Sequence, residues 1–153
     1  MSQENELKLL QEIERLKRQV ERLKVGEAAA GFVPLTTPLT STSWDGDSFS
    51  TTAKTKIDLS DVFGAPAGIK AILVRVSLRD SGSAAGNPWL LLSPNDTKNM
   101  GALCLRAAGI ANDALVDESG ICPCDANGDV YYQCAATGSN TLDVWLQIWG
   151  YWL

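Results

Sequence analysis

Four cysteines are the residues of this chain best suited to metal or redox chemistry. Cys122 and Cys124 stand two positions apart, whereas zinc ribbons and thioredoxin-like motifs leave two residues between paired cysteines. A four-thiolate metal site would have to recruit Cys104 and Cys134 from distant segments. We therefore interpret all four as small buried hydrophobic residues in a reducing cytosol, with disulfides formed after release from a cell, or a metal site, as alternatives. The prediction is no metal ligand and no cofactor.

Catalysis is disfavoured because the 153 residues include no histidine. Its absence removes the commonest general base, the Ser-His-Asp arrangement and most zinc sites. Glycoside hydrolysis would need two carboxylates across a cleft, and nothing in the sequence indicates such a pair. We predict no catalytic residues and no enzyme activity, and a small polysaccharide-degrading enzyme is the least favoured alternative.

Two acidic stretches could bind a ligand. DANGDVYY, Asp125–Tyr132, places oxygens at alternate positions as a calcium loop does, but it lacks the later bidentate glutamate, and Asn127-Gly128 between two predicted strands favours a type I′ hairpin turn. SWDGDSFS, residues 43–50, sets a tryptophan beside carboxylates, a combination that can hold a sugar. The candidate glycan contacts are Trp44, Asp45, Asp47 and Trp89. The alternative is that Trp44 anchors a turn and Trp89 belongs to the core at a strand start.

The first segment has the pattern of a coiled-coil helix. Apolar residues recur over 4–25 at alternating steps of four and three, and this spacing predicts a coiled-coil helix over residues 1–26. The seam positions, expected to mediate oligomerisation, are Leu9, Ile13, Leu16, Val20 and Leu23. The heptads leave a dimer and a trimer open, and a helix lying on its own globular domain is the alternative. Residues 27–53 are rich in Thr, Ser and Pro and predict a neck that is an extended linker or an edge strand.

From residue 54 onward the hydrophobic period becomes two, which predicts strands. Ile72, Val74, Val76 and Leu78 share one face of the first long strand. A short helical turn is expected at Asp58–Phe63. Further strands are expected at Trp89–Ser93, Ala102–Ala107, Ala114–Asp117, Asp129–Ala135 and Thr141–Trp149. The predicted fold is mainly β: an N-terminal α-helical coiled-coil stalk followed by an antiparallel, jelly-roll-like β-sandwich head over residues 54–153.

The last predicted strand is apolar on one face and carries aromatic and polar residues on the other. Leu142, Val144, Leu146 and Ile148 alternate with Asp143, Trp145, Gln147 and Trp149. The first set is expected to face the core. Because exposed tryptophans need a reason, we expect the outward residues Trp145, Trp149 and Tyr151 to form a seam between subunits.

Charge and hydropathy exclude several partners. Of the 18 acids and 13 bases, six of each fall in residues 1–30, which leaves 12 acids and seven bases, a net charge of −5, for residues 31–153. An acidic body predicts no nucleic-acid partner. No signal peptide and no run long enough to cross a membrane is visible, so we expect a soluble protein made in the cytosol without membrane insertion.

The combination of a heptad segment, a Thr/Ser/Pro-rich neck and a β-domain ending in an aromatic strand resembles virion-surface proteins of tailed bacteriophages. The stretches PLTSTSWDGDSFSTTAKTKIDLSDVFGAPAGIKAILVRVSLRD, CPCDANGDVYY and LDVWLQIWGYW are similar to the C-terminal heads of phage fibre or head-fibre proteins. The resemblance covers roughly residues 35–153 and includes no catalytic motif.

The resemblance implies a homotrimeric virion protein, assembled in the host cytoplasm, whose partners are phage capsid or tail proteins and host-surface glycans. It transfers no receptor-binding residue to this chain. The alternative is a capsid decoration protein that stabilises the head, and the short heptad segment, compared with a tail fibre, keeps a capsid-mounted position open.

Overall fold

All strands among the described residues lie between positions 32 and 152. The structure, a computed structural model, describes residues 12–18, 31–44, 46, 52–80, 88–107, 113–136 and 141–153. The chain divides into two units, Met1–Gly31 with Leu153, and Phe32–Trp152. The elements of the second unit are β1 (Phe32–Leu39), β2 (Thr55–Ile57), α2 (Leu59–Phe63), β3 (Ala71–Asp80), β4 (Trp89–Ser93), β5 (Leu103–Arg106), β6 (Leu115–Pro123), β7 (Val130–Ala135) and β8 (Leu142–Trp152).

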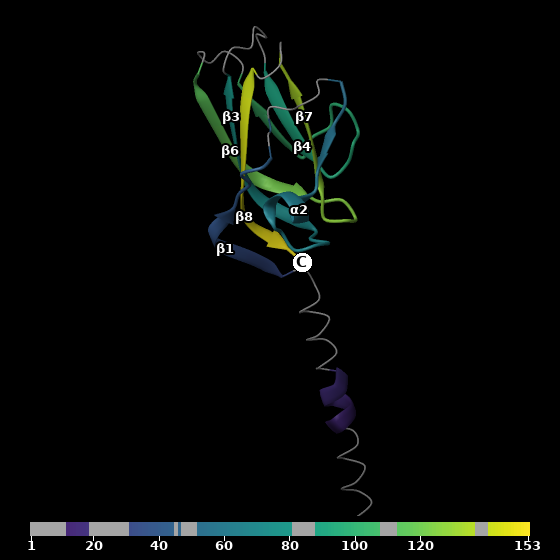
Figure 1. The fold of residues 1–153 in the computed structure, drawn as a ribbon. Coiled ribbons are helices and arrows are strands. Elements are labelled where there is room, and N and C mark those ends of the chain that lie inside the picture. The colour runs from purple at the N-terminus through teal and green to yellow at the C-terminus, as the bar shows by residue number, and fades with distance from the viewer. Residues whose placement is uncertain are drawn as a thin grey trace, which may run out of the picture. The chain divides into compact units, whose positions relative to one another are not determined.

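The strands pair in nested order, the first with the last, the second with the second-to-last, and so on inward. The antiparallel pairs are β1 with β8, β2 with β7, β3 with β6, and β4 with β5. The pairings of β3 with β8 and β4 with β7 join them into two four-stranded sheets, β1-β8-β3-β6 and β2-β7-β4-β5. Figure 1 shows β3, β6 and β8 in one layer and β4 and β7 in the other. This is the winding of an eight-stranded jelly roll, and the predicted β-sandwich is confirmed.

The core forms because the long strands alternate strictly. Ile72, Val74, Val76 and Leu78 on β3 are fully buried, and the core-facing residues of β8 between Leu142 and Ile148 are at most 5% exposed. Side chains from the other sheet, such as Leu90, Leu92 and Val130, meet them in the same cluster. The faces predicted from the alternation of both strands are therefore confirmed up to Trp149.

The short helix α2 lies where the sequence predicts a helical turn. The Asp58 carboxylate accepts hydrogen bonds from the backbone N–H groups of Ser60 and Asp61, which makes it the N-cap. Gly64 ends the helix with a φ of +70°, a conformation that glycine adopts without strain. The helix turns Leu59 and Phe63 into the core.

The predicted N-terminal coiled-coil stalk is wrong. The chain is mainly β, and the helices among the described residues are short: residues 12–18 and α2. Ile13 and Leu16, which the heptad pattern places in an apolar seam, are 40% and 48% exposed. The other seam positions, Leu9, Val20 and Leu23, lie outside the described residues. A short helix whose apolar stripe packs on nothing gains little stability, so heptad spacing alone does not make a stalk.

Among the residues that the structure describes, no helix is long and apolar enough to cross a lipid bilayer.

The segment predicted as a neck contributes a strand to the sandwich. β1 is the edge strand of the first sheet, and Phe32 lies opposite Trp152 in its ladder with β8. The sequence left an extended linker and an edge strand open, and the structure has the edge strand. Pro34 and Pro38 are tolerated there because a strand at a sheet edge leaves half of its N–H groups without a ladder partner.

A β-bulge near the end of β8 changes which residues face the core. Val74 of β3 lies opposite Ile148, but Leu73 lies opposite Gly150, so Trp149 is the extra residue. Beyond it, Tyr151 lies opposite the buried Ile72 and packs against the core. The expected outward position of Tyr151 is therefore wrong, because strict alternation does not continue through a bulge.

Candidate functional site

The outer face of the β1-β8-β3-β6 sheet carries most of the exposed large hydrophobic side chains of the sandwich. Phe32, Leu115, Ile121, Trp145 and Trp149 lie on this face and are between 37% and 54% exposed. The strand register divides them into two groups. We call Phe32, Ile121 and Trp149 the apolar end. The polar end consists of Trp145 with its neighbours on β3 and β6, including Leu115, which lies opposite Arg79.

The apolar end is built around a close approach to Gly150. The Phe32 ring packs on Trp152 with ring centroids 4.5 Å apart. A β-carbon at position 150 would lie 2.5 Å from two atoms of the Phe32 ring. Glycine is therefore required at this position for the ring to lie over the strand. Ile121 lies opposite Leu73 in the neighbouring pair of strands and extends the apolar surface to β6.

The polar end is built from charged residues around Trp145. Arg79 lies over the Trp145 ring, its Cζ 5.6 Å from the ring centroid, and its Nε donates to Asp143 Oδ2 at 2.6 Å. This geometry combines a cation–π contact with an ion pair. Nearby on the same face, a guanidinium nitrogen of Arg75 lies 2.9 Å from Oδ2 of Asp117 and forms a second ion pair.

The charged form of Asp117 is stabilised by two neighbours. The Ser77 hydroxyl donates to its Oδ1, and this hydrogen bond together with the Arg75 guanidinium holds the pKa of the Asp117 carboxyl below its usual range. The acids and bases of the polar end thus neutralise one another in pairs.

A hollow of about 560 Å³ lies at the polar end. The ladder between β1 and β8 ends at Leu39 and Ile148, so the first half of β8 pairs only with β3 among the described strands. The hollow is lined by Trp145 and Gln147 from the outer face of β8, by Arg79, and by the hydroxyl residues Thr40 and Ser41 that follow β1. A smaller hollow of about 320 Å³ adjoins it and adds Asp143.

Gln147, one of the residues that line the larger hollow, has a hydrogen-bond acceptor without a partner among the described residues. The side-chain oxygen Oε1 of Gln147 is buried and accepts no hydrogen bond. Such an atom costs free energy unless a partner arrives. Trp145 beside it is 46% exposed. A planar apolar surface next to hydroxyl, amide and carboxylate groups is suited to a ligand that has both an apolar face and hydroxyl groups.

The glycan contacts predicted from sequence are only partly brought together. Trp44 lines the hollow, but its ring packs on Phe63 and Tyr132 at centroid distances of 6.0 and 5.4 Å, so it anchors the segment after β1. Trp89 is half-buried at the start of β4 in the other sheet, away from the residues that line the hollow. The remaining two, Asp45 and Asp47, lie outside the described residues.

Sequence reasoning missed Arg79, Asp143 and Gln147 as members of a site. Alternation places each of them on the outer face. The signal that would have joined them is the register between β3 and β8, which sets Arg79 opposite Asp143 and Arg75 opposite Gln147. Register depends on strand pairing across the fold and is not visible in a single strand.

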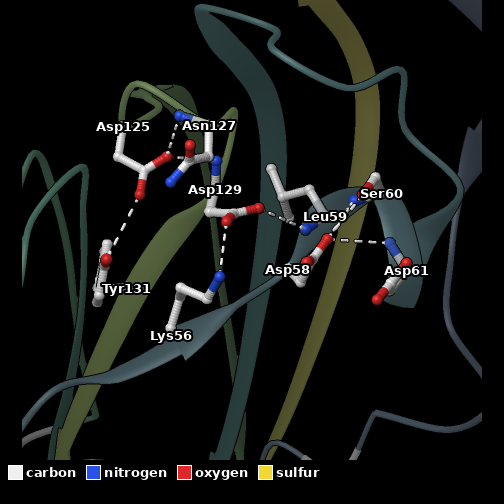
Figure 2. Close-up of polar contacts among 9 residues, drawn as sticks. All are labelled: Lys56, Asp58, Leu59, Ser60, Asp61, Asp125, Asn127, Asp129 and Tyr131. Carbon is white, nitrogen blue, oxygen red and sulfur yellow. Dashed lines mark hydrogen bonds and ion pairs between the residues drawn. The ribbon is translucent and has the colours of Figure 1, made fainter.

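The acidic stretch at residues 125–132 forms a turn whose carboxylates are already bonded (Figure 2). Asp125 accepts from the N–H groups of Asn127 and Asp129 at 2.8 and 2.9 Å, and the buried Asp129 accepts from Lys56 Nζ at 2.9 Å. Asp129 also accepts from Leu59 N at 3.3 Å, which ties the turn to α2. In the part of the chain that the structure describes, no group of His, Cys, Asp or Glu could hold a metal ion.

The predicted turn is present, but the predicted type I′ hairpin is wrong. Gly128 N donates to Asp125 O at 3.1 Å, and Gly128 has a φ of +93°. A type I′ turn needs positive φ at both central residues, and Asn127 is not among the described residues with positive φ. The turn also connects β6 and β7, which belong to different sheets.

Two of the four cysteines have thiols of low reactivity. Burial raises the pKa values of the Cys122 and Cys124 thiols to about 12, so both are protonated at neutral pH and are poor nucleophiles and ligands. Cys122 and Cys134 are buried, as expected of small hydrophobic residues. The same expectation is wrong for Cys104, which is exposed on the edge strand β5.

Comparison with known proteins adds no relative: neither a protein-family model nor a curated protein matches this chain.

Proposed function

We propose that this chain is a structural, non-enzymatic virion-surface protein of a tailed bacteriophage, and that its β-sandwich is a homotrimeric attachment head for host-surface glycan. The observation that carries the proposal is the outer face of the β1-β8-β3-β6 sheet. Trp145 and Trp149 keep 46% and 37% of their surfaces exposed there. Exposed aromatic patches of this kind mark contact surfaces in soluble proteins.

The fold and the sequence support the same class of protein. Eight-stranded jelly rolls occur in viral capsid and lectin domains. A fold by itself does not determine function, so the support comes from its combination with the sequence resemblance to phage head domains and with the face just described. The lack of histidine in all 153 residues supports a binding role over a catalytic one.

The two ends of the face suit two different contacts. The apolar end presents Phe32, Ile121 and Trp149 without a charged residue among them, and covering it would remove apolar surface from water at about 25 cal/mol per Å². Covering the polar end would also remove water from two ion pairs, which offsets much of the gain. We therefore place the subunit contact at the apolar end and the glycan contact at the polar end.

A capsid decoration protein is the second candidate. The predicted stalk was the sequence feature that favoured a fibre over a decoration protein, and the structure overturns that prediction. In the decoration protein the apolar end of the face would lie on capsid subunits instead of on other copies of the chain.

The first test is the solution mass of the full chain by multi-angle light scattering. We expect a trimer, and we expect Trp149→Ala to shift it towards monomer at concentrations where Trp145→Ala remains trimeric. A full chain that is monomeric at every concentration, together with binding to emptied phage capsids, would favour the decoration protein.

The second test is retention of the labelled full chain by surface polysaccharides purified from a panel of bacterial strains. Retention by at least one polysaccharide is expected. If none retains the chain, the attachment role is wrong.

A further inference from the structure

The hollow at the polar end carries an inference about the class of ligand. The inference rests on the proposed attachment function and narrows it. Three observations bear on it: the exposed ring of Trp145, the unused acceptor of Gln147, and the balance of charge around Arg79.

The Trp145 ring is held in a fixed position. Arg79 lies over the ring and is itself fixed by Asp143, whose side chain is 18% exposed. An aromatic ring that is both exposed and held by neighbours offers a preorganised stacking surface, because binding does not have to order it. A pyranose ring has an apolar face of C–H groups that can lie on such a surface.

Gln147 indicates that the ligand should carry a hydrogen-bond donor. Its buried Oε1 has no donor, and a ligand hydroxyl would supply one. A site that contains a buried acceptor favours a ligand that bonds it over an analogue that does not. The lining hydroxyls of Thr40 and Ser41 can donate to or accept from further hydroxyl groups.

The charges argue against an acidic ligand. Arg79 is the one cationic side chain among the described residues that line the hollow, and its guanidinium is paired with Asp143. Asp113 lines the same hollow and Asp143 lines the adjoining smaller one, so the two hollows together present two carboxylates and one cation among the described residues. The net charge of −5 of the chain adds a repulsive field for an approaching anion.

We propose that the hollow beside Trp145 binds a neutral sugar unit of a polysaccharide, with the sugar ring stacked on Trp145 and a sugar hydroxyl donating to Gln147 Oε1. Arg79 and Asp143 position the tryptophan. An acidic sugar, such as a uronic acid, is excluded by the carboxylates.

Isothermal titration calorimetry on the full chain tests this with four probes. Maltotetraose, mannotetraose and galactotetraose are neutral, and tetragalacturonate is the acidic counterpart of galactotetraose. We expect binding of at least one neutral probe, with an affinity that changes by less than about twofold between low and high salt, because no ion pair forms. Short probes keep the measurement independent of multivalent binding by a trimer.

Substitutions then locate the ligand. Trp145→Ala should weaken binding by about tenfold or more, whereas Trp145→Phe, which keeps a planar ring, should retain most of it. Gln147→Met keeps the shape and removes the acceptor, and should weaken binding roughly threefold to tenfold. Met100→Ala is the matched control, since Met100 is an exposed hydrophobic residue outside the hollow and should leave the affinity unchanged.

The outcomes separate this inference from the attachment function. If tetragalacturonate binds as tightly as galactotetraose, the neutral class is wrong while attachment to glycan stands. If no probe binds but a surface polysaccharide retains the chain, or if Trp145→Ala binds normally, the hollow is not the site. If neither probes nor polysaccharides bind, both proposals fail.

Discussion

The apolar and polar ends of the outer face are built on the same strands, yet they hold their tryptophans in different ways. At the apolar end, aromatic rings pack on one another, and Gly150 leaves room for Phe32. At the polar end, a single ring lies under a guanidinium that is paired with a carboxylate. Covering the apolar end with any apolar partner is favourable because it removes apolar surface from water. Covering the polar end is favourable only when the partner makes hydrogen bonds in place of those that the polar groups made to water.

This difference shows how one strand can serve two contacts. Trp145 and Trp149 are both outward residues of β8, but the bulge at Trp149 and the neighbours on β3 give them unlike surroundings. Exposure alone would assign both to one interface. The identity of the residues across the ladder decides which one suits a subunit and which one suits a hydroxylated ligand.

The largest expected effect comes from crowding the apolar end with Gly150→Ala. The new β-carbon would lie 2.5 Å from the Phe32 ring and displace it from Trp152. We expect the free energy of unfolding, measured by urea denaturation, to fall by about 1–3 kcal/mol. Gly31→Ala is the control, because its β-carbon would meet nothing within 4 Å. Equal stability of the two variants would mean that Phe32 is not held over the strand.

The next prediction is that replacing two different glutamines by methionine changes the stability of the chain in opposite directions. Gln147→Met removes an acceptor that bonds nothing, and we expect the free chain to become more stable by up to about 1 kcal/mol. Gln133→Met removes a buried acceptor that bonds Asn99 N at 3.0 Å, and should destabilise the chain by about 1–3 kcal/mol. Thermal unfolding of both variants measures this. Destabilisation by Gln147→Met would show that its oxygen has a partner in the free protein.

A smaller effect is the stability loss at the polar end, which should depend on salt concentration where the loss at the apolar end does not. Arg79→Ala removes a half-exposed ion pair with Asp143, so we expect a loss of at most about 1 kcal/mol at low salt. The loss should shrink in 1 M NaCl, because salt screens exposed charges. The loss caused by Gly150→Ala should not shrink. If both losses respond to salt alike, the division of the face into apolar and polar ends is wrong.

The smallest effect is the pH dependence of Asp117. Its pKa is lowered in the folded chain by the Ser77 hydroxyl and Arg75, so it contributes stability that is present above the unfolded pKa of about 3.9 and is lost as the pH falls through the folded value. Carboxyl-carbon NMR titration should give a pKa below the ordinary value, and Ser77→Ala should move it upward. No upward movement would show that the hydroxyl does not hold this carboxylate.

Local sequence was a good guide wherever neighbours along the chain determine the structure. The alternation in β3 and β8 predicted their buried faces, and the capped turn before Gly64 predicted α2. These features depend on side-chain polarity and on backbone hydrogen bonds within a few residues. The heptad pattern was a poor guide, because a coiled coil needs a packing partner that hydrophobic spacing does not supply.

Sequence by itself determined that the chain forms strands around an apolar core and that its last strand carries tryptophans on the outside. Only the tertiary structure decided that β1 joins the sheet, that a bulge turns Tyr151 inward, and that Arg79, Asp143 and Gln147 meet beside Trp145. The reason is physical. Alternation is a property of each strand alone, whereas register, bulges and the residues opposite one another arise when strands far apart in the chain pair.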